Sequence, residues 1–158
     1  VGFHTWLSLI AIVAGFPAAA ALLKGHLSPR WNGIFLWTAI ATSATGFLFP
    51  FSGVLPSHIV GAISLVLLAV AAIALYARGL QGGWRRTYAI TAMLSFYLLI
   101  FVLIAQLFLK VPVLNAMAPT QAEPPFAIAQ ALTLMVFLVL TVLAAKRSSG
   151  SSAPLRAV

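Results

Sequence analysis

The sequence predicts an all-α integral membrane protein on three observations: its apolar content, its shortage of charged residues and the length of its apolar stretches. Apolar residues make up 63% of the 158 residues, charged residues make up 6%, and the chain has a single acidic side chain. Soluble globular proteins carry about 25% charged residues, so this chain lacks the polar side chains to cover a water-exposed surface. Its hydrophobicity also excludes intrinsic disorder. The third observation is a set of five apolar stretches, each long enough to cross a bilayer.

These stretches are expected to form a bundle of five transmembrane helices. A hydrocarbon core of about 30 Å requires roughly 20 residues at a rise of 1.5 Å each. The stretches cover residues 3–23, 31–50, 57–77, 87–109 and 126–145, and none contains Lys, Arg, Asp or Glu. Barrel strands would be about ten residues long and alternate in polarity, a pattern that this sequence lacks. We expect one domain over residues 1–147 and a flexible cytoplasmic tail over residues 148–158.

Prolines and glycines mark the expected helix ends. Pro29, Pro56 and Pro124 are suited to the first turn of a helix, and Gly79 lies between the third and fourth stretches. Residues 120–123 (Thr-Gln-Ala-Glu) match a capping box ahead of the last stretch. Pro17 lies inside the first stretch and is expected to kink it.

The basic residues predict the orientation. With five crossings, the first loop, the third loop and the C-terminal tail share one side of the membrane. They hold eight of the nine bases: Lys24, Arg30, Arg78, Arg85, Arg86, Lys146, Arg147 and Arg156. The positive-inside rule makes that side cytoplasmic, with the N-terminus outside, and a bacterial inner membrane is the expected location. Arg78, Arg85 and Arg86 are expected to contact anionic lipid headgroups. Because the bases are scattered between apolar runs, the net charge of +8 does not indicate nucleic-acid binding.

A candidate ligand site follows from the polar residues expected near the outer ends of the helices. His4, His58, Gln106, Glu123 and Gln130 are predicted to line a cavity there, since polar groups in hydrocarbon are costly unless they are paired. If the first and third helices are neighbours, His4 and His58 could together hold haem iron or another metal ion. The simpler interpretation is that the histidines lie at the membrane interface and that Glu123 caps the last helix.

The side-chain inventory argues against an enzyme. The chain has no Cys and no Asp, which excludes a thiolate nucleophile and a Ser-His-Asp triad, and a single Glu cannot form a carboxylate pair. Three hypotheses remain. The chain binds an apolar small molecule or cofactor (a quinone, a lipid or a tetrapyrrole such as haem) near the outer face; it is an accessory or assembly subunit of a larger membrane complex; or it forms an oligomeric pore or exporter.

Overall fold

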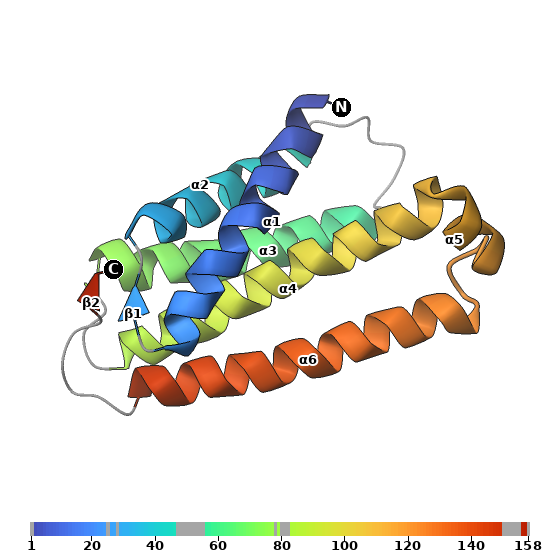
Figure 1. Ribbon diagram of the computed structural model, residues 1–158. Helices are drawn as coiled ribbons and strands as arrows, with labels where there is room; N and C mark the ends of the chain where they lie inside the picture. Colours follow the sequence, from blue (N-terminus) through green and yellow to red (C-terminus); the bar gives the residue numbers. More distant parts are fainter. Residues whose placement is uncertain are drawn as a thin grey trace.

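The computed structural model describes residues 2–24, 26–27, 29–46, 56–77, 79, 83–149 and 156–157. This part of the chain is almost entirely helical, as predicted (Figure 1). Its elements, in chain order, are α1 (Gly2–Leu23), β1 (His26–Leu27), α2 (Pro29–Gly46), α3 (Pro56–Ala72), the π-helix η1 (Ile73–Ala77), α4 (Trp84–Lys110), α5 (Pro112–Met117), α6 (Pro124–Ser149) and β2 (Arg156–Ala157). The two-residue strands β1 and β2 pair in parallel.

Proline begins four of these helices, because its fixed φ suits the first helical position and its missing N–H is not needed there. The four are α2, α3, α5 and α6. Gly79, which follows η1, has a φ of 59°, a left-handed conformation that glycine adopts without steric cost. Helix α5 was not expected: it forms between the stretches predicted at residues 87–109 and 126–145. Pro17 lies inside α1, where it has no N–H to donate to the carbonyl of Val13.

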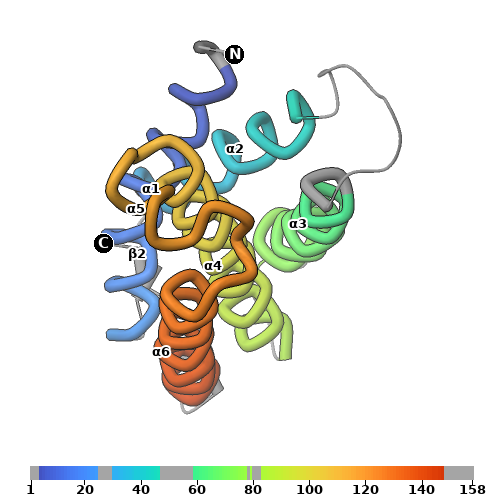
Figure 2. The backbone as a smooth tube through the Cα atoms, turned by 90° about the vertical axis from the view of Figure 1, so that its right-hand side faces the viewer, coloured from blue at the N-terminus to red at the C-terminus, as the bar shows by residue number. Residues whose placement is uncertain are grey.

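Helix α4 is the central element of the bundle. It packs against α1, α2, α3 and α6, which surround it in the end-on view of Figure 2. Its 27 residues make it about 40 Å long. The chain segments that precede and follow α4 therefore lie at opposite ends of the molecule.

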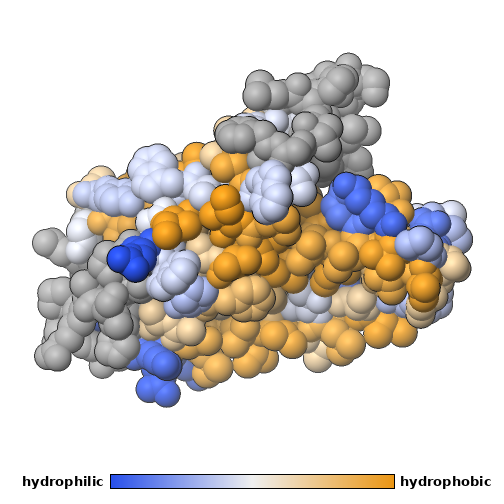
Figure 3. Space-filling view, turned by 45° about the horizontal axis from the view of Figure 1, so that its top comes forward, coloured by the Kyte–Doolittle hydropathy of each residue, from blue (hydrophilic) through white to orange (hydrophobic). Residues whose placement is uncertain are grey.

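Within the described residues, four helices are long and apolar enough to cross a membrane, which is compatible with an integral membrane protein. These spans are His4–Leu23, Ile59–Ala77, Trp84–Lys110 and Pro124–Arg147. Figure 3 shows a largely hydrophobic middle and strongly hydrophilic atoms near the two ends of the molecule. Helix α2 lies at the second of the five predicted stretches, which is the one not among these four spans. Its described residues include Arg30 and Asn32, and residues 47–50 are outside the described part of the chain. The count of five therefore stays a prediction.

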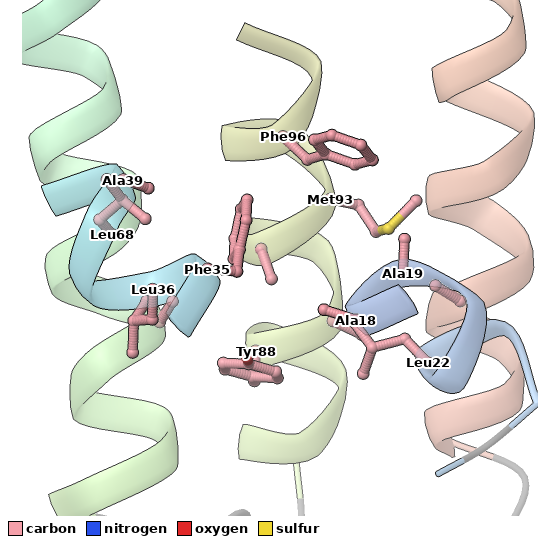
Figure 4. Close-up of a cluster of buried hydrophobic side chains, with 14 of the residues drawn as sticks. Ala18, Ala19, Leu22, Phe35, Leu36, Ala39, Leu68, Tyr88, Met93 and Phe96 are labelled. Carbon is pink, nitrogen blue, oxygen red and sulfur yellow. The ribbon is translucent and has the colours of Figure 1, made fainter. Parts of the chain in front are cut away.

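The core lies where α1, α2 and α4 meet, with α3 and α6 at its sides (Figure 4). Alanines of α1 and α4 line this region, since small side chains let helices approach closely. Phe96 of α4 is the central aromatic residue. Its ring makes edge-to-face contacts with Phe16, Phe35 and Phe137, at centroid distances of 5.1, 5.9 and 5.4 Å. A Cβ atom on Gly15 would lie 2.6 Å from Phe96 Cε1, so the ring fits only because residue 15 is glycine.

Candidate functional site

His4 of α1 forms a hydrogen bond to the neighbouring helix α2. Its Nδ1 atom lies 2.9 Å from Thr45 Oγ1. The Thr45 hydroxyl has one proton, and this proton is directed to the carbonyls of Ala41 and Thr42, at 2.7 and 3.1 Å. These distances favour Thr45 Oγ1 as the acceptor and His4 Nδ1–H as the donor.

The other histidine of the predicted pair, His58, lies in the first turn of α3, but its side chain is outside the described residues. The proposed pairing of His4 with His58 therefore stays a prediction. Among the described residues, no group of three or more His, Cys, Asp or Glu side chains is arranged to hold a metal ion.

Three side-chain amides donate hydrogen bonds to consecutive turns of α4. Gln130 Nε2 donates to the carbonyl of Phe101 at 3.1 Å, and Gln121 Nε2 donates to that of Ala105 at 2.7 Å. Asn115 Nδ2 lies 3.4 Å from the carbonyl of Phe108. These bonds fasten α5, α6 and the turn between them to the end of α4. Gln130 is 8% exposed, and its Oε1 atom is buried without a hydrogen-bond partner in the described structure.

Glu123 closes the turn that precedes α6. Its carboxylate accepts hydrogen bonds from the Thr120 hydroxyl at 2.7 Å, from the Thr120 N–H at 3.2 Å and from the Ala122 N–H at 3.1 Å. The Thr120 hydroxyl bond is the main reason that the pKa of Glu123 is lowered. The N–H of Thr120 is bonded as a capping box requires, but α6 begins only at Pro124. The Thr120 hydroxyl donates to the same carboxylate, so these residues close the turn ahead of α6.

The remaining predicted residues are dispersed. Gln106 is exposed on α4. Arg86 is exposed and Arg85 is 5% exposed, and the expected contact of these residues with lipid headgroups stays a prediction. Arg78 lies outside the described residues. Exposed bases lie at the end of the bundle where α1 and α6 finish and α2 and α4 begin: Lys24, Arg30, Arg86, Lys146 and Arg147. Lys110 lies at the opposite end of α4.

A surface groove of about 300 Å³ lies between α1, α4 and α6, away from the predicted residues. The residues that line it are Phe16, Ile100, Leu132, Thr133, Val136 and Phe137. The one polar group among these side chains, the Thr133 hydroxyl, already donates to the carbonyl of Ala129 at 2.8 Å. The groove therefore offers an almost purely apolar surface near the middle of the three helices.

A second, internal cavity of about 10 Å³ lies between α1, α2 and α4. Its volume suits a group about the size of one water molecule. Its lining residues are Gly15, Ala18, Ala19, Leu22, Asn32, Phe35, Ala92, Met93 and Phe96. Asn32, which is 3% exposed, is the one polar side chain in that set. The sequence signal for this residue was an amide inside an apolar stretch, whereas the groove residues look like any other apolar helix positions.

The chain matches no protein-family model, and no curated protein or solved structure is significantly similar to it. The arrangement of the helices and of these two cavities is therefore the basis for a functional assignment.

Proposed function

We propose that the protein crosses a bacterial inner membrane five times, with its N-terminus outside, and binds an elongated apolar molecule in the groove between α1, α4 and α6. The hydrogen bond between His4 and Thr45 supports a crossing by α2 in addition to the four long apolar helices, since it joins the start of α1 to the end of α2. The 18 residues of α2 thus extend over nearly the same depth as α1. The bases at the opposite end of this helix pair support a cytoplasmic location for that end.

The observation that carries the binding proposal is the groove itself. Its volume of about 300 Å³ is at the lower end of the range for small-molecule sites. Its position near mid-helix would open it to the acyl chains of the bilayer. Such a site selects a molecule that already resides in the membrane. Because the Thr133 hydroxyl donates to the carbonyl of Ala129, the groove has no polar group left to bind a charged ligand.

The lining residues narrow the ligand classes. A haem iron needs axial ligands such as His, Met, Cys or Tyr, and none of these lines the groove. A tetrapyrrole is therefore disfavoured, and the proposal is restricted to an isoprenoid quinone or a lipid, bound through its hydrocarbon part.

The test compares two substitutions on α6. Val136 lines the groove, whereas Val139 is one turn away, is exposed to a similar extent and does not line it. Val136→Trp should fill the groove and abolish binding of decylbenzene to the protein in phosphatidylcholine nanodiscs. Val139→Trp should leave that binding unchanged, because it adds the same bulk outside the groove.

Mass spectrometry of molecules that co-purify in mild detergent provides the second measurement. The wild type and Val139→Trp should carry the same apolar molecule, and Val136→Trp should lose it. The proposal is wrong if the wild type binds no decylbenzene and carries no such molecule, or if both variants behave like the wild type.

A further inference from the structure

Phe96 lies between the groove and the internal cavity. Its ring lines the cavity, and it also makes edge-to-face contacts with Phe16 and Phe137, two residues that line the groove. In Figure 4 its side chain extends from α4 on the same side as that of Met93, which also lines the cavity. One aromatic ring thus forms part of the wall that separates the two volumes.

We propose that the groove and the internal cavity are two parts of one binding site, divided by the Phe96 ring. The site takes a molecule with an apolar body and one small hydrogen-bonding oxygen at its end. The body lies in the groove, and the oxygen passes Phe96 to reach the amide of Asn32. This inference rests on the proposed function and specifies the ligand class of that site.

The chemistry of the cavity supports an oxygen atom at its far end. The cavity accommodates a group about the size of a water molecule, which suits a carbonyl or hydroxyl oxygen and excludes a ring. Asn32 is buried at 3% exposure, and a buried amide in apolar surroundings gains free energy when it forms a hydrogen bond. The Asn32 side-chain NH₂ group can donate to either kind of oxygen.

Gly15 also contributes to the wall that Phe96 forms between the two volumes. Gly15 lines the internal cavity, and it leaves the space that the Phe96 ring occupies. Because no Cβ is present on that side, the ring contacts α1 closely and closes the cavity without a bulkier side chain.

Two probes that share a decyl tail, one ending in an arene and the other in a quinone with two carbonyl oxygens, test the inference. Decylbenzene and decyl-1,4-benzoquinone have the same tail, but only the quinone has carbonyl groups. Binding of both is measured with the full protein in phosphatidylcholine nanodiscs. The wild type should bind the quinone more tightly than decylbenzene, by up to about fivefold, since one hydrogen bond contributes about 1 kcal/mol and the displacement of the Phe96 ring subtracts from it. Asn32→Leu should remove this preference and retain the affinity for decylbenzene.

Asn115→Leu is the matched control. It removes the amide of α5 that lies against the C-terminal end of α4, far from Asn32, and should leave the preference intact. Infrared spectroscopy of the quinone bound to the wild type gives a measurement that does not depend on a variant. One carbonyl band should lie at lower frequency than in the protein-free nanodisc. If decylbenzene binds but the quinone shows neither a preference nor a shifted band, the two-part site is wrong and the groove proposal stands. If neither probe binds, both proposals are wrong.

Discussion

At the scale of single residues, the contact between Gly15 and Phe96 determines how α1 packs on α4. Phe96 is 3% exposed and is surrounded by three other aromatic rings. Each edge-to-face pair of this kind adds about 0.5–1.5 kcal/mol beyond the burial of its area. The glycine is therefore part of the packing of this cluster, because any Cβ at position 15 would displace the ring on which the cluster depends.

We predict that Gly15→Ala destabilises the protein. The new Cβ would lie 2.6 Å from Phe96 Cε1, and overpacking of this kind costs about 1–3 kcal/mol. The measurement is the free energy of unfolding in mixed micelles. Gly33→Ala is the control, since a Cβ at Gly33 in α2 would have nothing within 4 Å and alanine favours the helix. Equal stability of the two variants would show that the Phe96 ring moves without cost.

At the scale of elements, the sequence was sufficient to locate the long helices. Long apolar runs predict α1, α3 with η1, α4 and α6 to within a few residues, because the length and composition of a span are local properties. Helix α5 was not predicted, since its six residues are too few for a periodic pattern. Pro112 at its start was the available signal.

The candidate site was harder to predict than the helices, because it depends on how the elements pair. Nothing in the sequence near His4 indicates that its ring nitrogen bonds Thr45, 41 residues away. The groove depends on the positions of α1 and α6 on α4, and Phe16 and Val136 carry no chemical feature that distinguishes them from lipid-facing positions. Only Asn32 had a local signal, as an amide within an apolar stretch.

The turn before α6 yields a prediction about pH. The pKa of Glu123 is lowered, chiefly by the Thr120 hydroxyl, so the folded state favours the ionised carboxylate. Its stabilising contribution is present above the unfolded pKa of about 4.5 and is lost as the pH falls through the lower folded value. The wild type should therefore lose stability on acidification below about pH 4.5, and Glu123→Gln should lack this component.

The measurement is the unfolding midpoint of the wild type and Glu123→Gln from pH 7 to pH 3. Since Glu123 is the single acidic side chain, the difference between the two proteins isolates its titration from that of the histidines. Parallel pH profiles would contradict the role of the carboxylate in closing this turn.

At the scale of the whole molecule, the positions of the basic residues predict which end of α4 faces the cytoplasm. This helix is about 40 Å long, which exceeds a hydrocarbon core of about 30 Å. If α4 crosses the membrane, the segment before Trp84 and the segment after Lys110 must be on different sides. By the positive-inside rule, the bases on the Trp84 side predict that this side is cytoplasmic. The crossing itself would place the groove, which lies near the middle of α4, within the bilayer.

We predict that reporter fusions will report opposite compartments for the two ends of α4. Inserted into the full chain after Gly83, a fluorescent protein that matures only in the cytoplasm should be active and an alkaline phosphatase inactive; inserted after Pro119, the two should exchange. Lys146→Gln with Arg147→Gln should not invert this result, because Lys24, Arg30, Arg85 and Arg86 remain on the same side. Lys110→Gln, which removes the base at the other end of α4, should likewise leave it unchanged. Activity of the same reporter at both positions would mean that α4 does not cross the membrane, and the groove could then not receive a ligand from the bilayer.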